Sequence, residues 1–407
     1  MVLAAAALAA VATPAFAPAR AQQQPATVAV VLSAHPAAAA VPAAMIRAGI
    51  EAAAAVANEE EAGRARPVRL VYADDQGTPA GAAEAAAKLL ADGAPVALIG
   101  GQSSPVTAPQ IAAAARAGRP FVNVNGWDPG LRLTGIADAF HVAPDAWTVP
   151  EALARSAAAI GAARVVLVAA AERGAAVRAE PVQAALGALR PPLEAPLAVL
   201  DVAARPPVAA AALRREPPDL LIALTPGAAG ARLLAGLRAA GVAPTAGTLV
   251  LDGAGIADAP GFWDDARDAG RLLLSVALQH PGIALTPRGA AARKRLPTDM
   301  AETRLFHQGA DALFALVDGL RAARGGDPAA LVRALDTGTA MGTRGPVRFR
   351  TEIGPRYRQR LEVPFALVQH VETGAPAARA RAVWVPGQPF DAARLARPAA
   401  RPTGAPR

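Results

Sequence analysis

Cysteine is absent from the sequence. Disulfide bonds, thiolate nucleophiles and cysteine-ligated metal sites are therefore excluded. Histidine is scarce as well, and the five histidines show neither the i, i+4 spacing nor the His-x-His pattern of common zinc sites. We therefore expect the protein to bind no metal ion and no cofactor.

Lysine is nearly as rare, since Lys88 and Lys294 are the only two lysines. The formal net charge of +8 comes from arginine, which is abundant together with alanine and proline. Residues 375–407 hold six arginines and one aspartate, which is +5 of that +8, so the rest of the chain is nearly balanced. This distribution indicates a coding bias more than a basic surface, and it argues against a nucleic-acid partner.

Long apolar runs are missing beyond the N-terminus, and no segment supplies the roughly 18 to 20 apolar residues of a membrane span. The N-terminal stretch MVLAAAALAAVATPAFAPARAQQQ is apolar and contains Ala19-Arg20-Ala21, an A-x-A cleavage signal. We predict a signal peptide over residues 1–21 and a mature protein that is soluble and exported.

Short β-rich runs alternate with longer helical segments from Ala26 onward. The runs are TVAVVL, VRLVYA, VALIG and FVNVNG, and after a break near residues 144–150 they are RVVLVAA, LAVLDV, DLLIAL and TLVLDG. Such alternation predicts βαβ units and parallel sheets. Because the pattern restarts after the break, we predict an α/β protein with two doubly wound lobes.

Ligands of open parallel sheets bind beyond the carboxyl ends of the strands, so the turns that follow the strands are the places to search. VRLVYA is followed by DDQGTP, which is typical of a structural turn with Thr78 as helix N-cap and Pro79 in the first helical turn. VALIG is followed by GQSSP. There we expect Ser104 to cap the next helix and Ser103 to point at whatever lies above the turn.

Three kinds of site can be compared at the Ser103-Ser104 turn. A phosphate-binding P-loop requires GxxxxGK[ST], and no lysine follows here. A nucleophile elbow requires GxSxG, and GGQSS differs from it. A helix N-terminus with hydroxyl and backbone N–H donors remains, which suits a carboxylate or a carbonyl oxygen. The alternative is that the two serines only cap a helix.

The order of these motifs resembles the periplasmic leucine/isoleucine/valine-binding protein family, the type I solute-binding components of ABC importers. The likeness includes the DDxGxP turn, xxIGGxxSS, a helix that ends in AGxPF, and the late block Met341–Phe349, and it covers residues 26 to 385 approximately. The resemblance implies the type I periplasmic-binding-protein fold, in which two doubly wound parallel-sheet lobes are joined by three crossovers. It also implies a binding protein and not an enzyme.

With this resemblance, residues 26–142 and 278–343 are assigned to lobe 1, and residues 143–277 and 344–390 to lobe 2. The chain is expected to cross between the lobes near residues 143, 277 and 344. Residues 391–407 are rich in Pro, Ala and Arg with little to bury, which predicts a disordered tail. Contact of this tail with an anionic membrane surface is the functional alternative.

The resemblance also implies where a small-molecule ligand lies. Carried over by position, Ser103 and Ser104 hold its carboxylate together with Asn125 and Gly126, which follow a neighbouring strand. Asp252, at the end of TLVLD, is the candidate that neutralises an α-ammonium group. The sequence departs from the family here, because LDGAGIAD lacks the family's glycine-flanked glutamate.

Two further residues are candidates for the ligand site. His35 lies in a turn, Ser33 to Pro36, that replaces the Gly-rich, aromatic-bearing turn of the family, and we expect it to line the cleft. Trp127 lies beside Asn125, where it would pack on an apolar part of the ligand. The alternative for Trp127 is simple burial.

The sequence therefore predicts a periplasmic, monomeric binding protein for a small polar or carboxylated solute, such as an amino acid, an amide or an organic acid. Its expected partners are the permease subunits of an ABC importer. A ligand sensor of the same fold, coupled to a signalling partner, is the alternative. An NAD-dependent enzyme is a weaker one, because Gly253-Ala254-Gly255 follows a strand but Asp258 occupies the third glycine position of the dinucleotide fingerprint.

Overall fold

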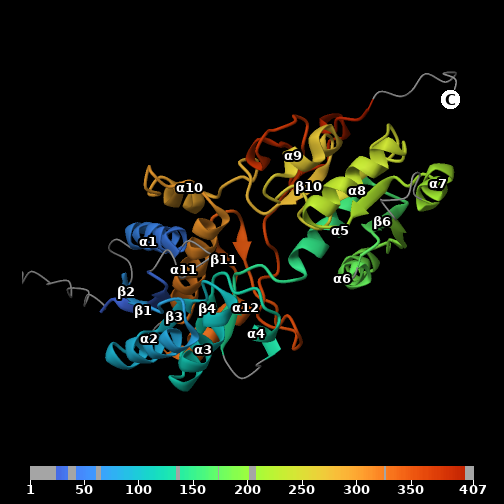
Figure 1. Ribbon diagram of the computed structural model, residues 1–407. Coiled ribbons are helices and arrows are strands. Elements are labelled where there is room, and N and C mark those ends of the chain that lie inside the picture. Colours follow the sequence, from blue (N-terminus) through green and yellow to red (C-terminus); the bar gives the residue numbers. More distant parts are fainter. Residues whose placement is uncertain are drawn as a thin grey trace, which may run out of the picture.

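The computed structural model describes residues 24–34, 43–60, 66–133, 138–172, 174–200, 208–324 and 327–398. The predicted signal peptide and His35 lie outside these residues. Two α/β lobes are visible in Figure 1, with the blue N-terminal strands in one and the green and yellow elements in the other. None of the described helices combines the length and the hydropathy that a membrane span needs.

Lobe 1 is built on a five-stranded sheet in which every strand is parallel to its neighbours, in the order β2-β1-β3-β4-β5. The strands are β1 (Ala26–Leu32), β2 (Val68–Asp74), β3 (Ala97–Gly100), β4 (Phe121–Asn123) and β5 (Ala139–His141). The helices are α1 (Ala43–Glu60), α2 (Pro79–Asp92), α3 (Ser104–Arg116), α4 (Gly130–Leu133), α10 (Pro287–Arg293), α11 (Arg304–Ala322) and α12 (Pro328–Thr337).

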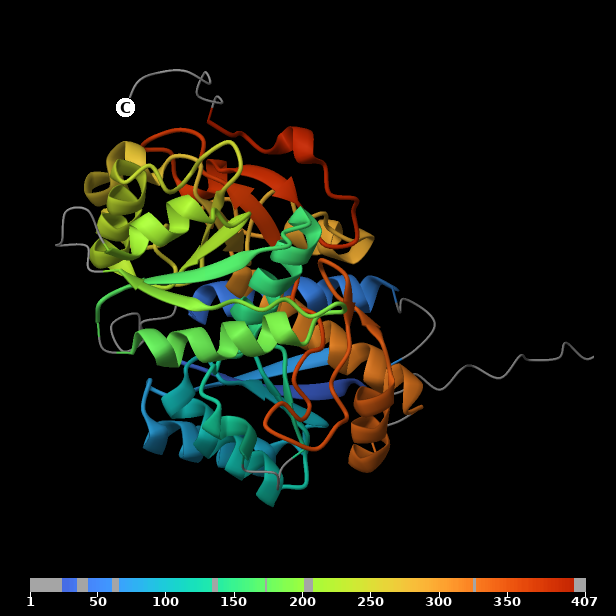
Figure 2. The ribbon, with the colours of Figure 1, turned by 90° about the vertical axis from the view of Figure 1, so that its right-hand side faces the viewer.

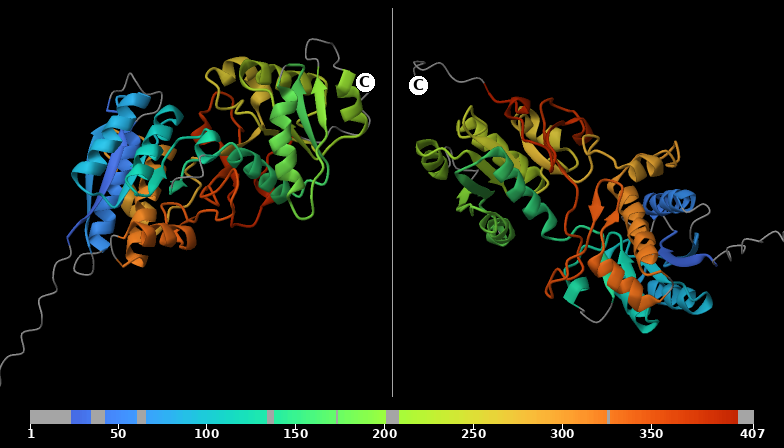
Figure 3. Two further views of the ribbon diagram at one scale, coloured as in Figure 1. Left: turned by 90° about the horizontal axis from the view of Figure 1, so that it is seen from below. Right: turned by 180° about the vertical axis from the view of Figure 1, so that it is seen from behind.

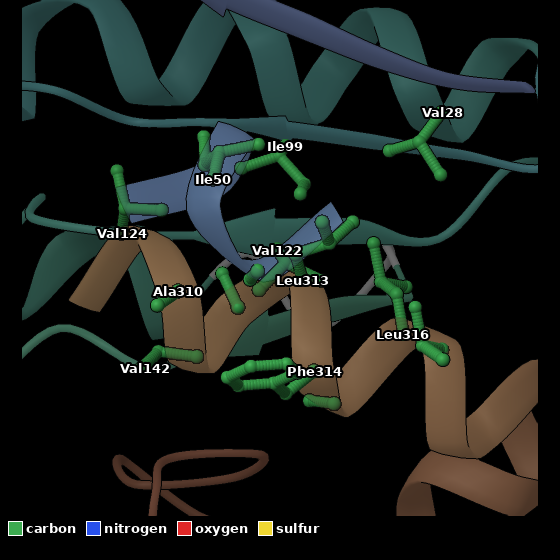
Figure 4. Packing of buried hydrophobic residues seen from close by; sticks show 14 of the residues in the cluster. Val28, Ile50, Ile99, Val122, Val124, Val142, Ala310, Leu313, Phe314 and Leu316 are labelled. Carbon is green, nitrogen blue, oxygen red and sulfur yellow. The ribbon is translucent and has the colours of Figure 1, made fainter. Parts of the chain in front are cut away.

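Strands β1, β3, β4 and β5 are buried, whereas the edge strand β2 is mostly half-buried. Burial on both faces explains why β1 and β3 are continuous apolar runs. Val28 and Val30 of β1 point to the face covered by α1 and α11, whereas Ala29 and Val31 point to the face covered by α2 and α3. Figure 4 shows the first of these two cores, where side chains of β1, β3 and β4 meet residues of α1 and α11.

Glycines allow α1 and α11 to approach each other closely. A Cβ atom added to Gly49 would overlap the backbone carbonyl oxygen of Phe306, and one added to Gly309 would overlap the carbonyl oxygen of Ile46. Each helix thus presents a glycine to the backbone of the other. The segment after the second crossover is thereby held firmly on lobe 1, although it lies far from α1 in the sequence.

Lobe 2 has a seven-stranded sheet in the order β14-β13-β10-β9-β8-β6-β7, with β13 and β14 antiparallel to their neighbours. The strands are β6 (Val165–Ala170), β7 (Leu197–Leu200), β8 (Leu220–Ala223), β9 (Leu249–Asp252), β10 (Leu274–Ala277), β13 (Ala366–Gln369) and β14 (Arg381–Trp384). The helices are α5 (Thr148–Ile160), α6 (Ala175–Gly187), α7 (Val208–Arg215), α8 (Gly227–Ala239) and α9 (Phe262–Ala266). Helices α5 and α6 cover one face, and α7 to α9 cover the other.

The chain passes between the two sheets three times. Figure 2 shows the two lobes one above the other, with the blue strands of lobe 1 below and the green strands of lobe 2 above. The first passage leads from β5 to α5 and the second from β10 to α10. The sequence predicted the third passage near residue 344, and this prediction is wrong. Strands β11 (Ala340–Met341) and β12 (Pro346–Val347) form a hairpin, after which Phe349 packs on Phe140 of lobe 1 and Gln359 bridges to His141. The third passage therefore lies between Leu361 and β13.

Part of the predicted disordered tail is packed on lobe 2. Residues 392–394 form a short 3-10 helix, and Leu395 is buried in the lobe 2 core. The side chain of Gln369 pairs with the backbone of Ala396, accepting from its N–H at 2.8 Å and donating to its carbonyl at 2.9 Å. The burial of Leu395 and the two hydrogen bonds of Ala396 hold residues 391–398 on lobe 2. Residues 399–407 lie outside the described part of the chain.

Candidate ligand-binding site

Three loops at the carboxyl edge of the lobe 1 sheet are tied together by the side chain and the backbone of Gln102. Gln102 is buried, and its Oε1 atom accepts the backbone N–H of Ser33 at 2.9 Å. The Nδ2 atom of Asn125 donates to the backbone carbonyl oxygen of Gln102 at 2.9 Å. The loops after β1, β3 and β4 therefore form one connected surface at the edge where ligands of such sheets bind.

The turn after β3 requires glycine. Gly101 has a φ of +79°, and a Cβ atom there would overlap the Oδ1 atom of Asn123. Its N–H donates to Oε1 of Gln110 at 2.8 Å, and Gln110 Nε2 donates in turn to Asp75 Oδ2 at 3.1 Å. Gln110 thus links this turn to the DDQGTP turn, where the prediction of Thr78 as N-cap is confirmed by its bond from the Gly81 N–H.

The two serines have exchanged the roles that the sequence predicted. The helix begins one residue earlier than expected, so Ser103 is the N-cap, and its hydroxyl makes no capping hydrogen bond. Ser104 is the first helical residue, and its Oγ accepts the backbone N–H groups of Trp127 and Asp128, both at 3.1 Å. A hydroxyl has two acceptor positions and one donor, so Ser104 retains its O–H for another partner.

Asn125 and Gly126 support the site from within. Asn125 is buried, and its Oδ1 atom accepts from Trp127 Nε1 at 3.2 Å and from Arg304 Nη1 at 2.9 Å. Gly126 closes a turn with Asn123, donating its N–H to Oδ1 at 2.7 Å and accepting from Nδ2 at 2.8 Å. The oxygen of Asn125 and the peptide of Gly126 therefore position their neighbours, and Trp127 is left half-buried beside them.

Arg304 is a member of this group that the sequence analysis did not identify. It is the first residue of α11 and lies half-buried, with its guanidinium carbon 5.2 Å from the centroid of the Trp127 ring. Its Nη1 atom also donates to Gln308 Oε1 at 2.8 Å. Burial lowers the pKa of the guanidinium. Arg304 stands 179 residues after Asn125, so no local pattern links the two.

Asp252 is at the carboxyl end of β9, at the corresponding edge of the lobe 2 sheet. Both carboxylate oxygens are used inside its own loop, since Oδ1 accepts the N–H of Ala254 and Oδ2 accepts that of Ala257, each at 2.9 Å. Burial raises the pKa of Asp252, and these backbone N–H groups act in the opposite direction. The contacts of Asp252 are therefore those of a residue that closes a loop.

The structure brings Ser103, Ser104, Asn125, Gly126 and Trp127 together on lobe 1 and places Asp252 on lobe 2. Among the described residues, no hydrogen bond or ion pair joins Asp252 to the lobe 1 group. Figure 3 shows the two lobes apart, with the red crossover segment between them.

Comparison with known proteins gives one family. The model of the periplasmic binding protein family matches residues 25–375. A search of curated proteins gave no significant match. The fold is similar to a Rhodospirillum rubrum protein described as a branched-chain amino acid ABC transporter, with a TM-score of 0.66, 17% identity, and coverage of 88% of this chain and 100% of the other.

Two other solved structures were obtained with ligands. An ABC transporter substrate-binding protein from Desulfitobacterium hafniense, in complex with Leu, matches with a TM-score of 0.57 and 17% identity, and the match covers 88% of this chain and 100% of the other. An ABC transporter solute-binding protein from R. palustris, in complex with benzoate, matches with a TM-score of 0.50 and 17% identity, and the match covers 89% of this chain and 96% of the other. These similarities show the fold, which is the type I periplasmic-binding-protein fold, and the family consists of solute-binding proteins and not enzymes. Since the family model matches most of its length, the chain belongs to the periplasmic binding protein family.

Proposed function

We propose that this protein captures a small polar or carboxylated solute between its two lobes in the periplasm and delivers it to the permease subunits of an ABC importer. The observation that carries the proposal is the connected surface at the carboxyl edge of lobe 1, where the Ser104 O–H and Arg304 lie beside Trp127. Hydroxyl and guanidinium donors next to an aromatic ring suit a small organic molecule with an oxygen-bearing end.

Closure of the two lobes is the step that couples capture to delivery. The chain connects the two sheets at three crossovers. Gln359, just before the third crossover, donates from its Nε2 atom to the carbonyl oxygen of Ala143 in the first crossover at 2.7 Å. A solute that contacts both lobes favours the closed form by its extra affinity for that form. Closure also removes water, which strengthens the polar contacts to the solute. The permease subunits would then bind the closed form of this protein, which is a monomer that carries one solute.

The ligands in the two similar structures guide the choice of test compounds. Leucine, bound to the Desulfitobacterium hafniense protein, and benzoate, bound to the R. palustris protein, both carry a carboxylate. This shared group agrees with the donors at the lobe 1 edge. It supports a carboxylated solute among the classes that the sequence left open.

Ligand screening of the full mature chain tests the proposal. Thermal-shift screening against amino acids, amides, organic acids and sugars should identify at least one stabilising solute, because a ligand that binds only the folded protein raises its melting temperature. Calorimetry should then give one site per chain, and small-angle X-ray scattering should show a smaller radius of gyration with the solute. Uptake of that solute by cells should fall when the gene is deleted. If the solute binds but uptake is unchanged, delivery to an importer is wrong.

A further inference from the structure

Hydrogen-bond donors without partners collect at the carboxyl edge of the lobe 1 sheet. The Nε2 amide of Gln308 and the hydroxyl of Ser33 are buried, and neither has a hydrogen-bond partner among the described residues. Ser104 retains its O–H, because backbone N–H groups fill both of its acceptor positions. Native proteins leave few buried polar groups unpaired, so a group of unpaired donors marks a place where a ligand supplies the acceptors.

Arg304 supplies the positive charge of this group. Its Nη1 atom donates to Asn125 and Gln308, while Nε and Nη2 make no hydrogen bond within the described part of the chain. None of the described carboxylates forms an ion pair with Arg304, and burial is the one cause that shifts its pKa, which it lowers. Partial burial of an unpaired cation is unfavourable, and a bound anion would supply the missing countercharge.

Five acidic residues at the two sheet edges are already engaged. On lobe 1, the carboxylates of Asp74, Asp75 and Asp128 accept backbone N–H groups of their own turns. On lobe 2, Asp252 accepts two N–H groups of its loop, and Glu172 pairs with an arginine of α6. The edges thus offer a cation and donors to a ligand, whereas these five carboxylates are bound within the protein.

We infer that Arg304 binds the carboxylate of the ligand, and that the ligand is an organic acid without an α-ammonium group. This inference rests on the proposed function and specifies its substrate class. A guanidinium binds a carboxylate through two parallel N–H bonds, and the Nε and Nη2 atoms of Arg304 have these donors available. An α-amino acid would place its ammonium group beside a cation, and the five carboxylates named above are bound within the protein and cannot compensate, which is unfavourable.

Trp127 completes the site with an apolar surface. Its indole is fixed by the Nε1 bond to Asn125 Oδ1 at 3.2 Å and by the guanidinium of Arg304, 5.2 Å from the ring centroid. The half-buried ring lies next to the atoms that receive the carboxylate. The apolar or aromatic body of the acid packs against this ring.

Pairs of ligands that differ only in the α-ammonium group test the inference. The pairs are 4-methylpentanoate with leucine and 3-phenylpropanoate with phenylalanine, and benzoate is a further acid. In isothermal titration calorimetry of the full mature chain, we expect the acids to bind at least about tenfold more tightly than the matched amino acids. The reason is that the acids lack the ammonium group, which would lie desolvated beside the like charge of Arg304.

Variants of Arg304 complete the experiment. Arg304→Gln should weaken binding of the acids by about ten- to hundredfold. Arg304→Lys should have an intermediate effect, because lysine keeps the charge but lacks the planar guanidinium that donates two parallel hydrogen bonds. Arg232→Gln, at an exposed arginine of α8, is the matched control and should bind as the parent protein does. Thermal unfolding of each variant verifies that it is folded.

Several outcomes overturn the inference. Amino acids that bind as tightly as their acids overturn it, as does a folded Arg304→Gln variant with unchanged affinity for the acids. Binding of amino acids that depends on Asp258, the exposed carboxylate in the loop after β9, also contradicts it. If only uncharged solutes bind, the inference is wrong and the proposed solute capture stands. If no solute of any class binds, the proposed function is wrong as well.

Discussion

Asp311 and Arg360 form an ion pair that is almost completely shielded from water. Arg360 Nη1 lies 2.7 Å from Asp311 Oδ2, and the two side chains are 2% and 0% exposed. The other oxygen of Asp311 accepts the N–H and the hydroxyl of Thr343 at 2.6 and 2.8 Å. Burial raises the pKa of Asp311, but Arg360 and Thr343 outweigh it, so the pKa lies below its ordinary value. The ion pair therefore holds the segment that precedes the third crossover against helix α11.

Removal of one partner of this pair should destabilise the protein strongly. Asp311→Asn leaves Arg360 buried without an anion, and we expect the free energy of unfolding to fall by about 3 to 5 kcal/mol. Urea unfolding at pH 7 measures this loss. Arg348→Gln is the control, because its pair with Glu362 is exposed and should contribute less than about 1 kcal/mol. Equal effects of the two variants would contradict the prediction.

The free energy of unfolding should also fall in mild acid. Burial lowers the pKa of His307 to about 3, although Glu302 lies 2.9 Å from its Nε2, and burial lowers that of His370 to about 4. Both rings stay neutral in the folded protein, whereas in the unfolded chain they bind protons below about pH 6.5. Stability is therefore fully present above that pH and is lost as the pH falls towards the folded pKa values.

Urea unfolding at a series of pH values measures this dependence. Each histidine should contribute a loss of about 2 kcal/mol between pH 7 and pH 5, since one pKa unit corresponds to about 1.4 kcal/mol. The double variant His307→Gln, His370→Gln should be less stable at pH 7 but should lose less on acidification. A parent protein with the same stability at both pH values would show that these histidines are not buried as neutral groups.

The close approach of α1 and α11 leads to a prediction about glycine. Gly49→Ala places a methyl group on the carbonyl oxygen of Phe306, which is backbone and cannot rotate away. We expect a loss of about 1 to 3 kcal/mol, as for other overpacked sites. Gly236→Ala, in α8 with no atom within 4 Å of the added carbon, should instead stabilise by about 0.5 to 1 kcal/mol. Thermal or urea unfolding of the two variants should give shifts of opposite sign.

The sequence predicted the parallel strands of both sheets, because burial of a strand on both faces demands an unbroken apolar run, but it did not predict the antiparallel strands β13 and β14 of lobe 2. β1 and β6 are such runs, and local patterns of this kind can be read without tertiary information. The third crossover was predicted too early. The return of residues 346–360 to lobe 1 depends on contacts such as Arg360 with Asp311, 49 residues apart, which no local pattern contains.

Only those parts of the candidate site that follow from local patterns could be predicted from the sequence. The Ser103-Ser104 turn and the Asn125–Trp127 turn follow strands, so topology alone brought them to one edge. Helix boundaries are uncertain by a residue from sequence, and that shift exchanged the roles of the two serines. Arg304 is one of many arginines, and only the packing of α11 against the sheet places it beside Trp127.

The two serines should respond differently to alanine. Ser104→Ala removes the acceptor for the N–H groups of Trp127 and Asp128, so the free energy of unfolding should fall by about 1 to 2 kcal/mol. Affinity for the solute should fall by about tenfold or more as well, because the O–H donor is lost. Ser103→Ala removes a cap without a hydrogen bond and should change stability by less than about 0.5 kcal/mol. Calorimetry and urea unfolding of both variants, compared with the parent, decide between these roles and the reverse assignment.

Asp252→Asn separates a loop-closing role from a ligand-binding one. Asparagine has one acceptor oxygen, so it can keep the bond from Ala254 or that from Ala257 but turns an amide group towards the other N–H. We expect the free energy of unfolding to fall by about 1 to 3 kcal/mol, the cost of a buried unpaired group. Affinity for the acid that binds best should change by less than about twofold, because both oxygens are used within the loop. Asp258→Asn, at an exposed position of the same loop, should leave both quantities nearly unchanged. A large loss of affinity in Asp252→Asn with unchanged stability would mean that Asp252 contacts the ligand, and it would restore an α-amino acid as the solute.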